Sequence, residues 1–312
     1  MAESKSKVLI IGATGYIGTY LVRASVKLEH PTFILVRSLT PSDPAKAQLI
    51  KSFQDSGVTV LKGDVGDRES LVAALRQVDV VISSVNQAEA LSSQVNILEA
   101  AKETGTIKRF IPSEFGNEVD RLEIDFKVLE GVFQKKRNVR REIEKSGIPY
   151  TVVLNGGFAG IFVAGLANDK VSAPPRDKVT IWGDGTAKAI LNTEEDIATY
   201  TIKSVDDPRT ANKLLHIRPK ENFLSQGELV ALWEKKIGHT LEKTVVSKEE
   251  LKKIIEESPF PANSRYAIRH SIFVKGDQTS FELGESDKDV EATELYPDVH
   301  YTTVSTYLDQ FV

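Results

Sequence analysis

Hydrophobic and polar residues follow two alternating patterns in the first half of this chain. Short runs rich in Val, Ile and Leu alternate with longer segments in which apolar residues recur every three or four positions, as in an amphipathic helix. The apolar runs are 8–11, 32–36, 58–61, 78–83, 109–112 and 150–154, and the helical segments are 16–27, 45–56, 68–76, 92–103 and 129–145. Strands this apolar are buried on both faces, so the pattern predicts an α/β fold of the Rossmann type, a parallel sheet with crossover helices.

The regular alternation weakens after residue 154. Stretches rich in Pro and Gly at 173–178 and 182–185 separate shorter elements, while 225–237 and 248–257 have amphipathic helical patterns. We therefore predict a dinucleotide-binding domain over residues 1–154. Residues 155–312 are predicted to form mainly a smaller substrate-binding lobe, with some elements returning to the sheet.

Three glycines spaced three apart follow the first strand. Gly12 would allow a sharp turn, Gly15 would let backbone N–H groups approach a pyrophosphate, and Gly18 would let the next helix pack closely on the sheet. Glycines also serve ordinary tight turns, but here they lie between a strand and a helix that leads to a second strand. The residues predicted to contact a dinucleotide are Gly12, Ala13, Thr14, Gly15, Tyr16, Ile17 and Gly18.

The residues after the second strand indicate which dinucleotide binds. An NAD site normally places Asp or Glu there to accept from the ribose 2′-hydroxyl, whereas this chain has Arg37, with Lys46 a little further on. Two cations suit a 2′-phosphate, so we predict NADPH as the cofactor. The alternative, that both side chains are ordinary solvated surface charges, stays open at this point.

Further ligand contacts are expected in the loops that follow the strands, because ligands of such sheets bind beyond the carboxyl ends of the strands. These loops are 12–18, 37–46, 83–90, 113–120 and 155–162. Within them, additional cofactor contacts are predicted at Ser84, Val85, Ser113, Glu114 and Phe115.

One lysine of the helix at 129–145 lies inside that helix's apolar stripe. At 100° per residue the stripe comprises Leu129, Val132, Phe133, Val139 and Ile143. Lys136 falls in its middle, whereas Lys135, Arg137 and Arg141 fall outside it. A lysine in this position must extend to the surface, pair with a carboxylate, or remain desolvated with a lowered pKa that suits proton transfer. Because Arg140 shares the sector, extension to the surface is the commoner outcome for such residues. The short-chain dehydrogenase signature, a Tyr four positions before a Lys, is absent at all eight tyrosines.

Composition narrows the remaining functions. The net charge of −4, with both signs interspersed, argues against nucleic acid and against a polybasic membrane anchor. The chain has no cysteine, and its five histidines lack metal-ligand spacing, so no metal site is predicted.

His270 lies in an apolar run, where a histidine is more commonly a hydrogen-bonded core residue, but we keep it as a candidate for substrate contact. With a short polar N-terminus and no apolar run near 18 residues, a cytoplasmic protein is expected.

The chain resembles the plant NADPH-dependent reductases of phenylpropanoid metabolism, which include pinoresinol-lariciresinol, isoflavone and phenylcoumaran benzylic ether reductases, with the eugenol synthases as close kin. The motifs that carry the resemblance are GATGYIG at 12–18, PSEFG at 112–116, GIPYT at 147–151, LWEKKIG at 232–238, FVKGD at 273–277 and LYPDV at 295–299. The phenylcoumaran benzylic ether reductase branch is the most similar. The resemblance implies an atypical short-chain dehydrogenase fold of the NmrA-like kind.

The resemblance also implies a mechanism and a partner. Lys136 corresponds to the family's catalytic lysine, and Arg37 and Lys46 to the residues that hold the 2′-phosphate. The lysine would assist loss of a para-phenol proton, the benzylic ether would open to a quinone methide, and the nicotinamide would deliver hydride to the benzylic carbon. The expected partner is a small phenolic substrate, and a second copy of the chain in a homodimer stays open.

Two segments depart from the family pattern, and both are expected to border the substrate. Residues 122–127 (LEIDFK) replace a proline-containing segment, and 154–159 (LNGGFA) replace a Ser/Ala-Asn-Cys-Phe-Ala pattern. The predicted substrate contacts are Asn155, Gly157, Phe158 and His270. The two glycines after Asn155 predict a larger pocket or a looser loop.

Two alternatives to a benzylic ether reductase stay open. One is an isoflavone, lignan or phenylpropene-forming reductase of the same family. The other is a non-catalytic NADP-sensing regulator, which would need the phosphate and ribose contacts but no inward-facing lysine.

Overall fold

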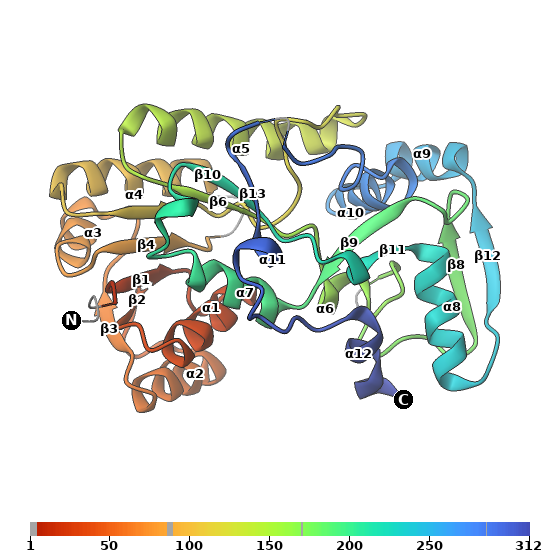
Figure 1. The fold of residues 1–312 in the computed structure, drawn as a ribbon, viewed down its shortest axis with the longest axis horizontal. Helices are drawn as coiled ribbons and strands as arrows, with labels where there is room; N and C mark the ends of the chain where they lie inside the picture. Colours follow the sequence, from red (N-terminus) through yellow and green to blue (C-terminus); the bar gives the residue numbers. More distant parts are fainter. Residues whose placement is uncertain (1–4, 86–89, 170, 285) are drawn as a thin grey trace.

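The computed structural model describes residues 5–85, 90–169, 171–284 and 286–312 (Figure 1). The loop predicted over 83–90 therefore lies partly outside the described residues, at 86–89. Within the described chain, a parallel five-stranded sheet has the order β3-β2-β1-β4-β5. Its strands are β1 (Val8–Ile11), β2 (Thr32–Val36), β3 (Thr59–Lys62), β4 (Val80–Ser83) and β5 (Arg109–Ile111).

Three further strands extend this sheet. A parallel bridge between Phe110 and Tyr150 joins β5 to the start of β6 (Thr151–Leu154). β10 (Lys213–His216) pairs with β6, and β13 (Asp289–Glu291) pairs with β10, again in parallel. The predicted parallel sheet is confirmed, and chain from well beyond residue 154 contributes to it. The division into domains at residue 154 stays a prediction.

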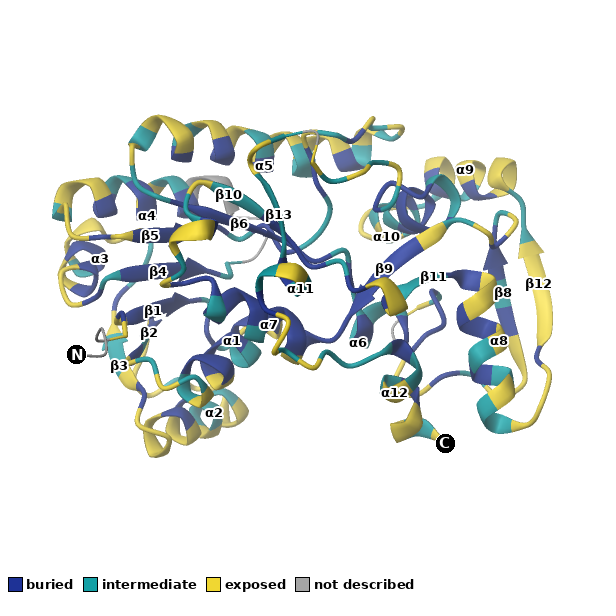
Figure 2. Cartoon of the chain, viewed as in Figure 1, coloured by how far each residue is buried: buried dark blue, intermediate teal, exposed yellow. Residues whose placement is uncertain are grey.

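Side chains of β1 show why a central strand of this sheet is apolar throughout. Val8 and Ile10 pack in one core with helices on one face of the sheet, and Leu9 and Ile11 pack in another core on the opposite face. The first face is covered by α1 (Tyr16–Lys27), α2 (Pro44–Asp55) and α7 (Glu194–Lys203). The second is covered by α3 (Arg68–Leu75), α4 (Ala90–Thr104) and α5 (Lys127–Ser146). Burial on both faces therefore selects an unbroken apolar strand (Figure 2).

The rest of the chain forms a smaller group of elements around its own core (Figure 1). Its strands are β7 (Gly157–Phe158), β8 (Lys178–Trp182), β9 (Lys188–Asn192), β11 (Phe223–Ser225) and β12 (Glu242–Val246). Its helices are α6 (Ala159–Phe162), α8 (Gln226–Ile237), α9 (Lys248–Glu257), α10 (Ala262–Arg269) and α12 (Val304–Leu308), and a π-helical segment spans His270–Lys275. α11 (Ala292–Leu295) lies beside β13.

The two helices predicted in this part begin where their sequences provide capping residues. Ser225 and Glu228 form a capping box at the start of α8, and Ser247 and Glu250 form another at the start of α9. Among the described residues, none of the helices combines the length and apolarity needed to cross a lipid bilayer.

Candidate cofactor and catalytic site

The glycine loop has the geometry that each of its glycines predicted. Gly12 has φ of +87°, and a Cβ there would lie 2.6 Å from the Ser84 carbonyl oxygen. A Cβ on Gly18 would lie 2.1 Å from the Gly12 carbonyl oxygen, so α1 packs closely against the loop. No described side chain caps the first turn of α1. Its backbone N–H groups and the positive end of its dipole therefore remain for a phosphate group.

Loops from three neighbouring strands meet beside these glycines. The Ser84 backbone N–H donates to the carbonyl of Ile11 at 2.8 Å, and the Ser84 hydroxyl donates to the same oxygen at 2.9 Å. Ser113 donates from its hydroxyl to the Val85 carbonyl at 3.0 Å. Phe115 has φ of +29°, a strained value for a non-glycine residue that the surrounding loop must hold in place. The structure thus brings Ser84, Val85 and Ser113 to the edge of the sheet where the glycine loop lies.

Arg37 directly follows β2, in which Leu35 pairs with Ile11, the last residue before Gly12. The Arg37 side chain is exposed, and Lys46 lies in the first turn of α2. Neither side chain forms an ion pair with any described residue. Both cations therefore remain free to bind an anion beyond the ends of β1 and β2, although their role stays a prediction.

Tyr16 connects the glycine loop to two distant segments. Its hydroxyl donates to Glu194 Oε1 at 2.5 Å, and the same oxygen accepts from the backbone N–H of Gly160 at 3.1 Å. The Tyr16 ring meets the Phe158 ring edge to face, with centroids 5.7 Å apart. Burial raises the pKa of the Glu194 carboxyl. The structure therefore places Phe158, a predicted substrate contact, against Tyr16 at the start of α1, within the predicted cofactor-binding segment.

Lys136 is buried, with 7% of the residue exposed, and does not extend to the surface. Its Nζ donates to the backbone carbonyl of Glu114 at 2.5 Å. A Cβ on Gly116 would lie 3.8 Å from this Nζ, so the amine faces the loop that follows β5. Burial lowers the pKa of Lys136, the Glu114 carboxylate opposes that shift, and Arg140 adds to it. Of the outcomes that the sequence left open for Lys136, the structure supports desolvation with a lowered pKa.

Arg140, one turn further along α5, is also buried and is held by carboxylates. Its guanidinium donates to Glu118 at 2.5 Å, to Glu114 at 3.1 Å and to Asp120 at 3.2 Å. Arg140 does not extend to the surface either, because buried acids in the loop after β5 neutralise it. Helical periodicity does not predict which carboxylates pair with Arg140. Two cations four residues apart on a buried stripe are a signal that carboxylates must lie opposite them.

Glu114 contacts two side chains of α5. Its side chain is 1% exposed and binds Arg140, while its carbonyl binds Lys136. These two contacts show how the residue supports α5. Contact of Glu114 with the cofactor stays a prediction.

The segment after β6 corrects one expectation. Asn155 is fully buried, its carbonyl accepts from Asn192, and its Oδ1 has no partner among the described residues. A Cβ on Gly157 would lie 2.9 Å from Phe162 and 3.2 Å from Leu191. The protein itself therefore fills the space beside this glycine. The expectation of an enlarged pocket or a looser loop was wrong for this reason, while the substrate role of Gly157 stays a prediction.

A substitution at Gly157 tests this packing. We expect Gly157→Ala to lower the free energy of unfolding by about 1–3 kcal/mol, because the methyl group overlaps well-packed neighbours. The matched control is Gly131→Ala in α5, where a Cβ would meet nothing within 4 Å. This change should raise stability by about 0.5–1 kcal/mol, as expected for Gly in a helix interior. Urea titrations of both variants measure the difference, and equal stabilities would contradict the packing explanation.

His270 lies on the π-helical segment, beside the unusual residues 122–127. Its Nδ1 is 3.8 Å from Asp125, its ring meets Phe126 edge to face at 5.0 Å, and its Nε2 has no partner among the described residues. Burial lowers the pKa of its imidazole. Lys275, on the same segment, donates to the carbonyl of Glu123 at 2.7 Å. His270 is thus a buried histidine whose hydrogen-bonding capacity is only partly used, and its substrate role stays a prediction.

Comparisons with known proteins cover nearly the whole chain. The model of the NmrA-like family matches residues 4–308. Phenylcoumaran benzylic ether reductase IRL1 of Ginkgo biloba is 57% identical to this chain over 308 residues, which cover 99% of each protein. Eugenol synthase 2 of Clarkia breweri is 56% identical over 309 residues, again 99% of each. The structure of AtPrR2 with NADP+ and (+)pinoresinol is similar with a TM-score of 0.93, at 37% identity and 99% coverage of both chains.

Proposed function

Because the chain belongs to the NmrA-like family and, like its relatives, is an NADPH-dependent oxidoreductase, we propose that it reduces a phenolic phenylpropanoid-derived substrate at a benzylic carbon. A benzylic ether is the substrate class that we favour. The observation that carries this proposal is the buried Lys136, whose Nζ faces the loop after β5 at the edge where the glycine loop lies.

Several residues fit the dinucleotide. The open first turn of α1 suits the pyrophosphate, and a Cβ on Gly15 would lie 3.1 Å from its nearest neighbour, the Gly12 carbonyl oxygen, so backbone approach needs a glycine there. Arg37 and Lys46 would hold the 2′-phosphate. When bound, NADPH supplies the hydride that the opened substrate accepts at its benzylic carbon.

Lys136 performs the proton transfer in this proposal. Its neutral amine accepts the proton of the para-phenol, and the electron pair released from that O–H bond moves through the ring. The benzylic C–O bond then breaks, its electron pair stays on the departing oxygen, and that oxygen takes a proton from solvent. After the benzylic carbon has been reduced, the ammonium of Lys136 returns a proton to the ring oxygen. A desolvated lysine suits both steps, because its lowered pKa lies closer to neutral pH.

Relatives with different names have nearly the same identity to this chain, 57% and 56%, so an isoflavone, lignan or phenylpropene-forming reductase remains the alternative substrate assignment. A sensor without catalysis would leave the buried amine without a role. Following NADPH oxidation by absorbance against a panel of dilignols, isoflavones and phenylpropenyl esters tests these assignments together. Turnover of a benzylic ether supports the proposal, and oxidation with none of the panel would contradict it.

Reversing the charge at Arg37 tests the cofactor assignment. We expect Arg37→Asp to weaken NADPH binding by roughly tenfold or more, because a charge-assisted hydrogen bond to the 2′-phosphate contributes about 1.5–3 kcal/mol. NADH binding should change little. Isothermal titration calorimetry with both cofactors measures this difference.

The control for that experiment is Lys51→Asp, which makes the same change of charge on the exposed side of α2, where Lys51 pairs with Asp55. It should bind NADPH as the unmodified protein does. Equal affinity of the unmodified protein for NADPH and NADH would contradict the role of Arg37. A cytoplasmic location and a homodimer stay predictions, which cell fractionation and light scattering can test.

A further inference from the structure

Four charged side chains are buried together where α5 meets the loop after β5. They are Lys136, Arg140, Glu114 and Glu118. The Arg140 guanidinium and both carboxylates are between 1% and 3% exposed. Arg140 bridges the two carboxylates, and the backbone of Glu114 binds the Lys136 amine. We call these four residues the inner cluster.

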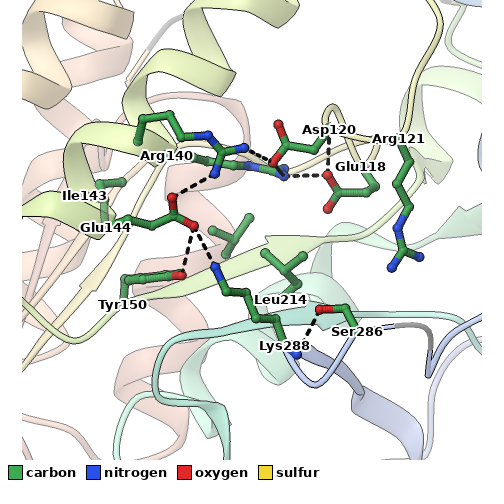
Figure 3. Close-up of a pocket in the computed structure, with 12 residues that line it drawn as sticks. Glu118, Asp120, Arg121, Arg140, Ile143, Glu144, Tyr150, Leu214, Ser286 and Lys288 are labelled. Atoms are coloured by element: carbon green, nitrogen blue, oxygen red, sulfur yellow. Dashed lines mark hydrogen bonds and ion pairs between the residues drawn. The ribbon is translucent and has the colours of Figure 1, made fainter.

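A second set of charges lines a cavity of about 300 Å³ together with Arg140 and Glu118 of the inner cluster (Figure 3). Asp120 pairs with Arg141 at 2.7 Å, and Glu144 pairs with Arg141 and with Lys288, each at 2.8 Å. This outer set has two carboxylates and two cations, so its own charges sum to zero. Asp120 also accepts from Arg140 of the inner cluster at 3.2 Å, so the two sets are in contact, and their combined net charge is that of the inner cluster alone.

The inner cluster is balanced in only one protonation state of Lys136. With a neutral amine, the inner cluster holds one cation and two carboxylates, and its net charge is −1. With an ammonium, two cations face two carboxylates, and the cluster is neutral. One oxygen of each carboxylate, Glu114 Oε1 and Glu118 Oε2, has no partner among the described residues. The carboxylates thus retain the capacity to stabilise a second cation.

We propose that Glu118 is a positioning residue that, through Arg140 and together with Glu114, stabilises the ammonium form of Lys136 while the substrate's proton resides on it. This inference rests on the proposed function, in which Lys136 accepts that proton. Burial weakens Lys136 as a base, and the surplus negative charge of the inner cluster opposes this effect of desolvation.

The electrostatics of Lys136 agree with this role. Burial lowers its pKa most, and the charged groups that act on it are Glu114 and Glu118, which raise its pKa, and Arg140, which lowers it. Glu114 and Glu118 belong to the loop after β5, and Arg140 belongs to α5. Because the neutral amine is the base, kcat should rise with pH through the pKa of Lys136.

Glu118→Gln is the decisive variant. Gln retains an oxygen for Arg140 and for the backbone N–H of Asp120, but it removes the charge. The acid limb of the kcat–pH profile should move to lower pH by about one unit, since an opposite charge near the amine is lost. The plateau of kcat should fall severalfold because the amine is a weaker base, whereas KM and NADPH affinity should stay unchanged.

Two further variants make the result decisive. Glu114→Gln removes the other charge of the inner cluster and should move the limb in the same direction. Glu144→Gln removes a charge from the same cavity but from the outer set, and its limb should stay where it is. The proposal would be overturned if the acid limb stayed in place in both Glu118→Gln and Glu114→Gln, or if it moved equally in Glu144→Gln. Failure of both Glu118→Gln and Glu114→Gln to fold would also overturn it.

The same profiles separate this inference from the proposed function. If the Lys136→Met variant kept its turnover, the proposed function would be refuted. If that variant lost turnover while the acid limb stayed in place in Glu118→Gln and Glu114→Gln, only the role of the inner cluster would be refuted.

Discussion

Replacing Lys136 by Met is expected to lower turnover by a factor of about 10² to 10⁴, the usual contribution of a positioned general acid or base. Met keeps most of the aliphatic volume of the buried side chain but cannot exchange a proton with the substrate's phenol. Purified protein should still fold and bind NADPH, because Lys136 lies outside the glycine loop. Steady-state NADPH oxidation with the best substrate, together with calorimetric NADPH binding, measures both quantities.

The neighbouring residue provides the control. Lys135 is exposed on the same helix, and Lys135→Met should leave turnover nearly unchanged. Lys136→Met protein that reduces its substrate within a few-fold of the unmodified rate would remove this amine from the mechanism. An equal loss in the two variants would instead point to damage of α5.

Replacing Arg140 by Met is expected to destabilise the fold by about 3–5 kcal/mol, because removal of one partner leaves buried charges without compensation. Glu114 and Glu118 would both lose their guanidinium while remaining 1% exposed. The loop after β5 would then lose the contact that holds it against α5, and turnover should fall with stability. Urea unfolding followed by circular dichroism measures the change.

Arg141 provides the matched comparison for this variant, since it is the next residue and also pairs with Asp120. Its side chain is 48% exposed, so solvent screens its ion pairs, and Arg141→Met should cost no more than about 1 kcal/mol. Similar losses at both positions would show that burial of the inner cluster does not determine its contribution to stability.

Local sequence predicted the main elements well because each depends on few neighbours. The apolar runs and helical segments of the first half appear as β1–β6 and α1–α5, with ends shifted by a few residues. The two helices predicted in the second half, α8 and α9, begin at Ser residues whose capping boxes can be read from the sequence. The parallel sheet was also predictable, because strands apolar on both faces need helices on both sides.

The packing of the second half was less predictable. β10 and β13 add to the sheet beside β6, although 58 residues separate the end of β6 from the start of β10. Such pairing depends on tertiary contacts between distant parts of the chain, and the sequence of a short apolar strand does not identify the strand with which it pairs. The glycines after Asn155 show the same limit, since residues from α6 and β9 fill the space beside them.

The sequence by itself determined the glycine loop, the cation after β2 and the inward-facing Lys136, since strand order and helical periodicity place these residues without long-range information. Only the tertiary structure decided what surrounds them. The Tyr16–Glu194 contact joins residues 178 positions apart, and the charge balance of Lys136 depends on a loop 18 to 22 residues away whose carboxylates turn inward. Periodicity shows which side of a helix is buried, but burial alone does not determine whether the Lys136 amine carries a proton. The charged groups brought together in the folded protein also determine this, because their interaction depends on distance in space and on exclusion of water.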